Sequence, residues 1–182
     1  MNASVTRVAE LIPPPEAVAP KDWAQVEQAL GTQLPEDYKQ LVDTFGGGVF
    51  DETVWLLEPG CSVPDYDLLS MAEERQEVLG NLWNHGEPKP AELETAGARL
   101  LPWAYAEEGG EFLYWLITPG QDPGTWPIMI NEGRGPEWEK HPGPCAAFLL
   151  SLMTGETSSG TFPELPAEEH QFDPNTEILS GD

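Results

Sequence analysis

The stretch DWAQVEQALGTQLPEDYKQLVDTFGGG, residues 22–48, carries the clearest structural signals in the chain. Asp22 is placed to cap a first helix, and Gly31 provides the left-handed residue that commonly ends one. The apolar residues between them recur at helical spacing and share one face: Trp23, Val26 and Leu30. The sequence therefore predicts a short amphipathic helix from about residue 22 to residue 30.

A second helix is predicted to begin at Pro35, because proline is favoured at the first helical position. Glu36 and Asp37 follow it, at the positive end of the helix dipole. The apolar residues fit the i, i+3, i+4, i+7 pattern: Tyr38, Leu41, Val42 and Phe45. The glycine run 46–48 then ends the helix and lets the backbone turn tightly into the next segment.

The chain outward from this helix pair alternates blocks of helical and strand-like pattern. Strands are expected at residues 49–57, 100–106, 111–118, 126–131 and 137–141, and further helices at 66–85 and 145–154. The glycines at 109 and 110 favour a hairpin between the second and third strands. Because the elements do not alternate strictly as βαβ, we expect an α+β fold with an antiparallel, or partly mixed, sheet packed against several helices.

We expect one folded domain, at residues 21–155, with a segment on either side of it. Residues 1–20 are interpreted as a flexible arm, because prolines at positions 13, 14, 15 and 20 prevent a continuous helix. Residues 156–182 are interpreted as an acidic tail, mobile or draped over the surface, because the chain turns polar after Gly155.

The charge of the chain is strongly negative. Eight Lys and Arg stand against 32 Asp and Glu among 182 residues, a formal net charge of −24. Such a surface repels nucleic acid and anionic membranes and attracts basic proteins, but it also serves solubility alone. The composition leaves both readings open and excludes direct binding of nucleic acid.

No stretch approaches the ~18 consecutive apolar residues that a membrane span needs. The N-terminal 20 residues contain one Arg, a proline run and no long apolar core, so they do not resemble a secretory signal peptide. The two cysteines give no disulfide framework. These features favour a cytoplasmic protein that does not act at a membrane.

The sequence offers no catalytic or metal-binding pattern. The histidines at 85, 141 and 170 are far apart and lack metal-ligand spacing, and neither Cys61 nor Cys145 lies in a nucleophile motif. Pairs of acidic residues are expected by chance in so acidic a chain. We therefore expect no enzyme activity, no metal and no cofactor.

A set of motifs resembles the SUKH superfamily, which groups fungal cell-wall-synthesis regulators with many bacterial proteins. The resemblance lies in Trp23, Val26-Glu27, Leu30-Gly31, Leu34-Pro35, Asp37-Tyr38, the glycine run 46–48, Leu101–Ala104, the Gly110 turn into 112–117 and the helix at 145–153. It covers roughly residues 20–155. The helix at 66–85 and the acidic tail depart from the pattern, so the resemblance assigns them no role.

The resemblance implies an α+β fold and a role in protein binding. Bacterial members are mostly immunity proteins that neutralise toxins, many of which are nucleases, and nucleases tend to be basic because they hold phosphate backbones. The charge of the chain suits such a partner. We therefore expect a cognate basic toxin as the partner. The alternatives are a regulatory or scaffolding module without a toxin, and an acidic mimic of nucleic acid.

We expect the partner to bind an acidic face that carries aromatic anchors, since interfaces favour that combination. The candidate residues are Asp51, Glu52, Glu107, Glu108, Glu111, Trp126, Glu132 and Trp138.

Overall fold

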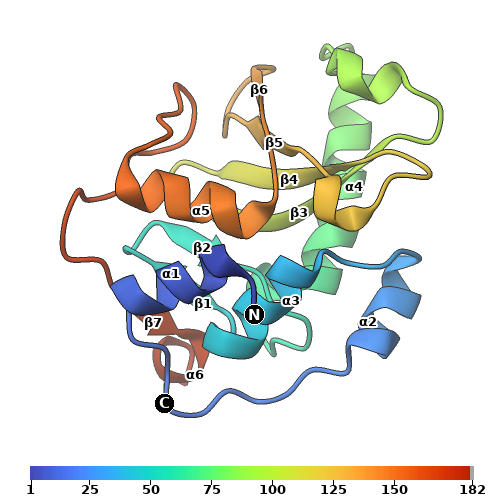
Figure 1. Ribbon diagram of the computed structural model, residues 1–182. Coiled ribbons are helices and arrows are strands. Elements are labelled where there is room, and N and C mark those ends of the chain that lie inside the picture. Colours follow the sequence, from blue (N-terminus) through green and yellow to red (C-terminus); the bar gives the residue numbers. More distant parts are fainter. Residues whose placement is uncertain (181–182) are drawn as a thin grey trace.

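The computed structural model describes residues 1–180 and consists of one antiparallel sheet with helices on both faces (Figure 1). The strands of this part of the chain are β1 (Gly48–Phe50), β2 (Val54–Leu56), β3 (Arg99–Ala106), β4 (Glu111–Ile117), β5 (Ile128–Asn131), β6 (Trp138–His141) and β7 (Phe172–Pro174). Their order in the sheet is β6-β5-β4-β3-β2-β1-β7, and all neighbouring strands run antiparallel. The predicted α+β class is confirmed.

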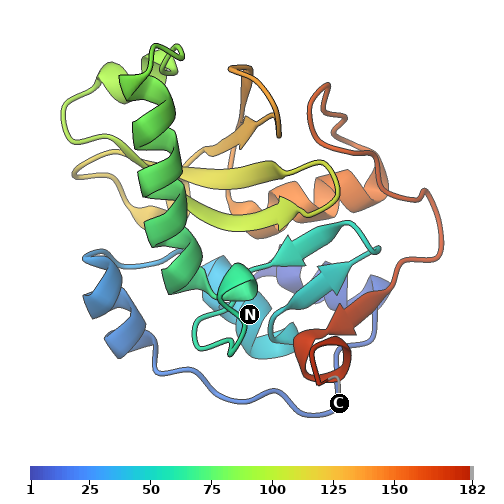
Figure 2. The same ribbon diagram turned by 180° about the vertical axis from the view of Figure 1, so that it is seen from behind.

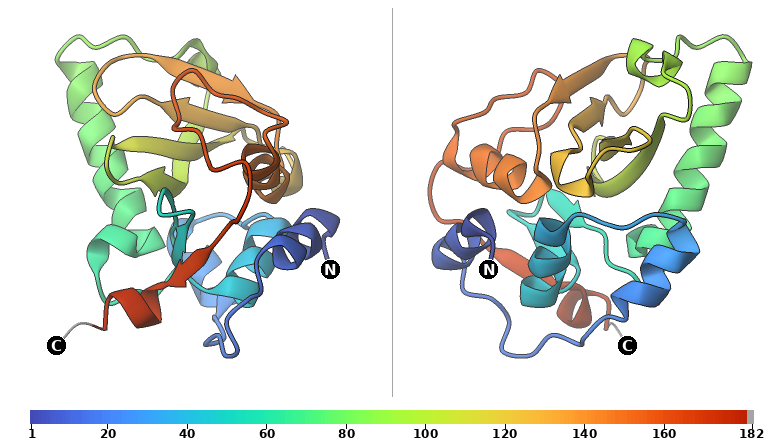
Figure 3. Two further views of the ribbon diagram at one scale, coloured as in Figure 1. Left: turned by 90° about the vertical axis from the view of Figure 1, so that its left-hand side faces the viewer. Right: turned by 45° about the vertical axis from the view of Figure 1, so that its right-hand side comes forward.

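The helices form two layers around the sheet. They are α1 (Ala3–Leu11), α2 (Trp23–Leu30), α3 (Glu36–Phe45), α4 (Leu68–Asn84), α5 (Cys145–Thr154) and α6 (Asn175–Ile178), with short 3-10 helices η1 (Pro64–Tyr66), η2 (Ala91–Glu94) and η3 (Pro123–Thr125). Helix α4 lies along one face of the sheet (Figure 2), and α1, α3 and α5 lie on the opposite side (Figure 3). The aromatic centre of the core lies under α3. There the rings of Tyr38 and Trp115 pack edge to face, with their centres 4.9 Å apart.

The two helices predicted with the most detail are confirmed at both ends. The Asp22 side chain accepts a hydrogen bond from the N–H of Gln25 at 3.2 Å, and Gly31 ends α2 at φ +73°. Helix α3 begins directly after Pro35, with two acidic residues in its first turn. Local capping signals therefore suffice to place these helices.

The glycine run is needed for close packing as well as for ending α3. A Cβ on Gly48 would lie 2.4 Å from the carbonyl oxygen of Asp173, and one on Gly47 would lie 2.5 Å from the carboxyl carbon of Glu58. Both distances are shorter than carbon atoms tolerate. The run thus lets strand β7 and Glu58 approach the backbone.

The prediction of a flexible arm over residues 1–20 is wrong for its first half. Asn2 caps helix α1 by accepting a hydrogen bond from the N–H of Ser4 at 2.9 Å. Val5 and Val8 are fully buried, and α1 packs against α3 and α5. The prolines do not prevent this helix, because they all follow its end. Residues 13–22 continue as a strap without regular structure.

The single strand predicted at 49–57 is also wrong, because a tight hairpin divides it into β1 and β2. Asp51 and Glu52 form the turn with φ of +52° and +56°. Positive φ at both central residues gives the twist that antiparallel strands need. The usual Asn-Gly or Asp-Gly signal is absent here, which explains why the turn was missed.

The prediction of a tail outside the domain at residues 156–182 is wrong for its described part, 156–180. This part packs into the core and adds a strand to the sheet. Phe162 is 3% exposed in the core. Strand β7 pairs with β1 and extends the sheet by one strand, and α6 follows it. Residues 181 and 182, which the predicted tail also included, lie outside the described residues.

Glu139 on β6 anchors the first part of this C-terminal segment. Four donors surround its carboxylate: His141 Nε2 (3.0 Å), Ser159 Oγ (2.6 Å), the Gly160 N–H (2.8 Å) and Thr161 Oγ1 (3.0 Å). Burial acts to raise the pKa of Glu139, but these hydrogen bonds outweigh it and lower the pKa.

A lowered carboxyl pKa gives stability that is complete above the unfolded pKa of about 4.3 and is lost as the pH falls through the folded value. We therefore expect residues 156–165 to become sensitive to an acid-active protease such as pepsin at a higher pH in Glu139→Gln than in the wild type. Glu164→Gln, a change on an exposed residue of the same segment, serves as the control and is expected to behave as the wild type. Equal digestion of all three proteins at every pH would contradict this role.

Within residues 1–180, none of the helices has the length and apolar character that crossing a membrane requires.

Candidate functional site

The sheet register brings four separate loops to one edge of the molecule. The end of β1 pairs with the start of β7, the start of β2 with the end of β3, the start of β4 with the end of β5, and the end of β5 with the start of β6. The loops at these ends are residues 51–53, 107–111, 132–137 and 168–170, and we call them together the acidic edge. Figure 2 shows the first two of these turns next to each other at the right of the sheet.

The acidic edge concentrates negative charge. It carries nine carboxylates and a single Arg, Arg134: Asp51, Glu52, Glu107, Glu108, Glu111, Glu132, Glu137, Glu168 and Glu169. Most of these side chains are exposed, while Asp51 is buried and those of Glu111 and Glu132 are half-buried. Folding therefore turns acids spread over about two thirds of the sequence into one surface.

The loops of this surface support one another. A Cβ on Gly133 would lie only 1.7 Å from the carbonyl oxygen of Gly109, so the 132–137 loop rests directly on the 107–111 turn. Glu132 Oε1 accepts a hydrogen bond from the N–H of Glu137 at 3.1 Å, which holds its own loop closed. The backbone of these two loops is thus held by packing, so it has little conformational freedom to lose on binding a partner.

A row of aromatic side chains crosses the sheet directly behind the acidic edge. The residues are in register from β2 to β6: Trp55, Tyr105, Phe112 and, beyond Asn131, Trp138. Trp55 and Trp138, at the two ends of the row, are half-buried, while Tyr105 and Phe112 are 6% exposed. The surface therefore combines charge with two partly exposed tryptophans, the mixture that protein interfaces favour.

Tyr66 on η1 links the aromatic row to the acids. Its ring stacks on Trp55 at 4.1 Å, and its hydroxyl donates to Glu107 Oε1 at 2.8 Å. Burial, and then the hydrogen bond to Glu107, raise the pKa of Tyr66 to about 12. The hydroxyl therefore stays protonated as a donor and fixes the direction of the Glu107 carboxylate.

Six of the eight residues predicted for the site lie on this surface with side chains that face outward at least in part: Glu52, Glu107, Glu108, Glu111, Glu132 and Trp138. Asp51 lies in the acidic edge but is 6% exposed, because its carboxylate accepts hydrogen bonds from His170 Nδ1 at 2.7 Å and the N–H of Gln171 at 2.8 Å. It fastens the C-terminal segment to the β1–β2 turn and does not present its charge to a partner.

Trp126 is not part of this surface. It lies before β5, at the opposite end of that strand, where it is 2% exposed and packs near Trp115 at 6.0 Å. Trp55 and Tyr66, and not Trp126, are the aromatic residues that lie beside the acidic edge together with Trp138. Glu168 and Glu169 were missed because the tail was placed outside the fold. Among these unpredicted residues, only Trp55 had a sequence signal for an outward-facing side chain. It alternates with Val54 and Leu56, whose side chains face the core.

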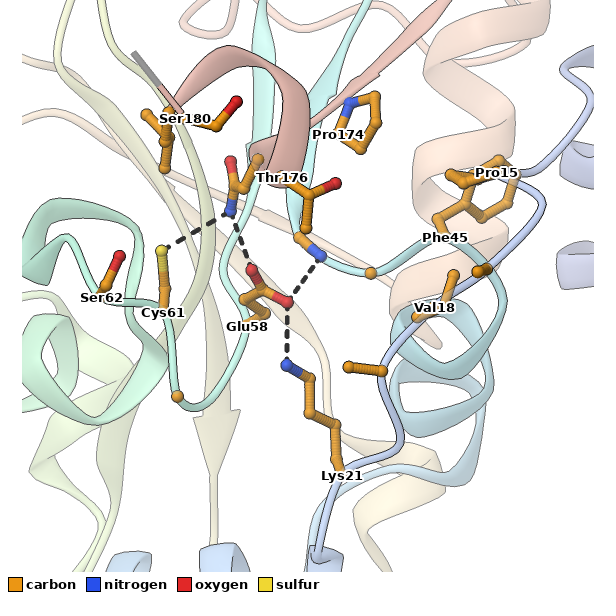
Figure 4. Close-up of a pocket in the computed structure, with 17 residues that line it drawn as sticks. Pro15, Val18, Lys21, Phe45, Glu58, Cys61, Ser62, Pro174, Thr176 and Ser180 are labelled. Carbon is orange, nitrogen blue, oxygen red and sulfur yellow. Dashed lines mark hydrogen bonds and ion pairs between the residues drawn. The ribbon is translucent and has the colours of Figure 1, made fainter. Parts of the chain in front are cut away.

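A second feature is a pocket of about 370 Å³ between the strap and the C-terminal segment (Figure 4). At its centre, Glu58 accepts hydrogen bonds from Lys21 Nζ at 3.0 Å, the N–H of Gly47 at 3.0 Å and Asn175 Nδ2 at 3.1 Å. Figure 4 shows the Glu58 carboxylate between Lys21 on the strap and helix α6. These partners come from the strap, the glycine run and α6, so the cluster fastens the strap and α6 to the sheet.

The thiols do not form a nucleophilic site. Burial raises the pKa of Cys61, which lines the pocket beside the strap, so its thiol is held in the weakly nucleophilic protonated form. Burial, and then Asp37, raise the pKa of Cys145 well above its usual value. Among the described residues, no group of three His, Cys, Asp or Glu side chains is arranged to hold a metal ion.

Comparison with known proteins gives one family match. The model of the family described as SMI1-KNR4 cell-wall, a SUKH family, matches residues 20–142, which cover α2, α3 and strands β1 to β6. The matched region includes three of the four loops of the acidic edge. No curated protein matches the chain.

Proposed function

The chain belongs to the SMI1-KNR4 family of SUKH proteins, a family that includes toxin-immunity proteins, and from this premise we propose that it binds a basic toxin through its acidic edge and thereby neutralises it. The observation that carries the proposal is the acidic edge itself: eight carboxylates on exposed or half-buried side chains and one Arg, gathered from four loops in front of two half-buried tryptophans. A nuclease fits this surface best, since the groove that holds its nucleic acid is lined by Lys and Arg.

Binding would block the toxin by occupying that groove. In such a complex, the exposed carboxylates of the acidic edge would take the place of phosphates and attract the same cations, which speeds the encounter and sets the orientation. Trp55 and Trp138 supply apolar contact area at the two ends of the aromatic row, and such contacts slow dissociation. No bond is made or broken, so the proposed role is stoichiometric and not catalytic.

The proposal is tested with the protein encoded by the gene next to that of the chain. We expect the two purified proteins to co-elute as a complex, and we expect expression of the chain to restore growth to cells that produce the neighbouring protein. The complex is expected to persist above ~0.5 M salt, where the Debye length falls to roughly 4 Å. The proposal would be contradicted if the chain formed no complex with such a toxin-like neighbour and did not restore growth.

Two other outcomes identify the alternatives. A stable complex with a non-toxic housekeeping protein would point to a regulatory module, which the cell-wall description of the family favours. Binding to many unrelated basic proteins that disappears at raised salt would point instead to a mimic of nucleic acid.

A further inference from the structure

A groove runs between helix α4, the end of α2 and the segment that leads through η2 into β3. It encloses about 480 Å³ and lies on the face of the sheet that α4 covers. Figure 2 shows this region at the left of the molecule, away from the turns of the acidic edge. Its volume is within the range of roughly 300–1,000 Å³ that small-molecule sites occupy.

The walls of the groove are largely apolar. Its apolar side chains come from α4, η2 and β3: Leu69, Leu79, Trp83, Leu93, Leu100 and Leu101. Leu79 and Leu101 are each 3% exposed and form the buried part of the wall, while the others are half-buried. The groove thus offers apolar surface that an elongated apolar molecule can cover.

The charge of the groove is opposite to that of the protein. Arg75, Lys89 and Arg99, three of the eight Lys and Arg in the chain, line it, and Glu73 is the one acidic residue that does so. By contrast, Arg7, Lys21 and Lys39, which lie elsewhere, each have a carboxylate within 4.0 Å. In residues 1–180, none of the three groove cations has such a partner, although acids outnumber bases fourfold in the chain.

The groove cations are placed by uncharged groups. Arg75 Nε donates to the Tyr114 hydroxyl at 2.9 Å, and Arg99 Nη2 donates to the carbonyl oxygen of Leu30 at 3.2 Å. Lys89 Nζ lies 5.1 Å from the centre of the Trp83 ring. These contacts hold the three head groups at the groove while leaving their positive charge uncompensated.

We propose that this groove binds a small amphipathic anion, a molecule with an apolar chain and a carboxylate or phosphate end. The apolar part of the ligand would lie along the leucines of α4 and β3. Its anionic end would accept charge-assisted hydrogen bonds from Lys89 and Arg99. This site uses residues outside the acidic edge, so it is independent of the proposed toxin binding.

Calorimetric titration with decanoate tests the proposal, with decyltrimethylammonium as the control of equal chain length and opposite charge. We expect decanoate to bind one to one and the cation to bind far more weakly. The net charge of −24 favours the cation, so non-specific attraction cannot produce this preference. Butyrate is expected to bind more than about tenfold more weakly than decanoate, because it covers less of the apolar wall.

The double variant Lys89→Gln with Arg99→Gln is expected to weaken decanoate binding on the order of tenfold or more, since it removes both charge-assisted contacts. The matched control is Arg134→Gln with Lys140→Gln, which removes two other cations without a carboxylate partner in the described residues and leaves the groove intact. It is expected to bind decanoate like the wild type. Absence of decanoate binding, equal binding of the cation, or an equal effect of both double variants would each overturn the proposal.

Discussion

Replacing Glu52, Glu107 and Glu108 together by glutamine is expected to weaken binding of the cognate toxin about 100-fold, at roughly 1 kcal/mol for each lost charge pair at an interface. All three side chains are exposed on the acidic edge, and glutamine keeps their size. It also keeps an acceptor for the Tyr66 hydroxyl, which bonds Glu107. The fold should therefore persist while the docking charge is lost.

The control for this experiment removes the same amount of charge elsewhere. Glu16, Glu77 and Glu94 are exposed and lie outside the acidic edge, so their joint replacement by glutamine gives a protein of equal net charge. We expect its affinity to stay within about threefold of the wild type, because distant surface charges act only through a screened field. Equal losses in the two triple variants, measured by calorimetry at one salt concentration, would mean that net charge alone determines binding.

Asp37→Ala is expected to lower the free energy of unfolding by about 2–3 kcal/mol, the largest effect among the stability changes considered. Asp37 belongs to the first turn of α3 but is 4% exposed, because its carboxylate reaches the start of α5. Its Oδ2 accepts hydrogen bonds from the N–H of Ala146 at 2.8 Å and from Cys145 Sγ at 3.3 Å. Pro144, the N-cap residue of α5, has no side chain that can accept a hydrogen bond. The carboxylate of Asp37 on α3 therefore caps the first turn of α5 from across the core.

Two variants isolate this tertiary cap. Asp37→Asn keeps an oxygen for the Ala146 N–H and should cost about 1 kcal/mol, the difference between a hydrogen bond to a charged group and one to a neutral group. Asp43→Ala, at the other end of the same helix, removes an exposed hydrogen bond from Trp23 Nε1 and should cost less than about 1 kcal/mol. Urea unfolding followed by far-ultraviolet circular dichroism measures all three. If Asp37→Ala lowered the free energy of unfolding no more than Asp43→Ala does, the role of Asp37 as a cap of α5 would be refuted.

The elements with complete local signals were predictable from the sequence. Helix α2 has a side-chain cap and helix α3 follows a proline, and both have a helical apolar face and a glycine stop within 27 residues. The Gly109-Gly110 turn identifies the β3–β4 hairpin. Helix α1 also has apolar residues at helical spacing, Val5, Val8 and Ile12, but the proline run directly after it is typical of a chain without regular structure.

Elements that depend on distant partners were not predictable. Strand β7 has three residues, and it is a strand because the glycine run leaves room for it beside β1. Asp51 is buried because His170, 119 positions away, pairs with it. The candidate acids of the β1–β2, β3–β4 and β5–β6 loops could be proposed from composition and turn position, but only the strand register places them on one edge.

Amide hydrogen exchange of the chain alone and in complex with the product of the neighbouring gene tests the central claim most directly. The account predicts slower exchange in residues 51–53, 107–111, 132–137 and 168–170 on binding, with α1 and α5 unchanged. Protection confined to the helical face of α1 and α5, or to the groove beside α4, with the acidic edge exchanging as in the free protein, would contradict it.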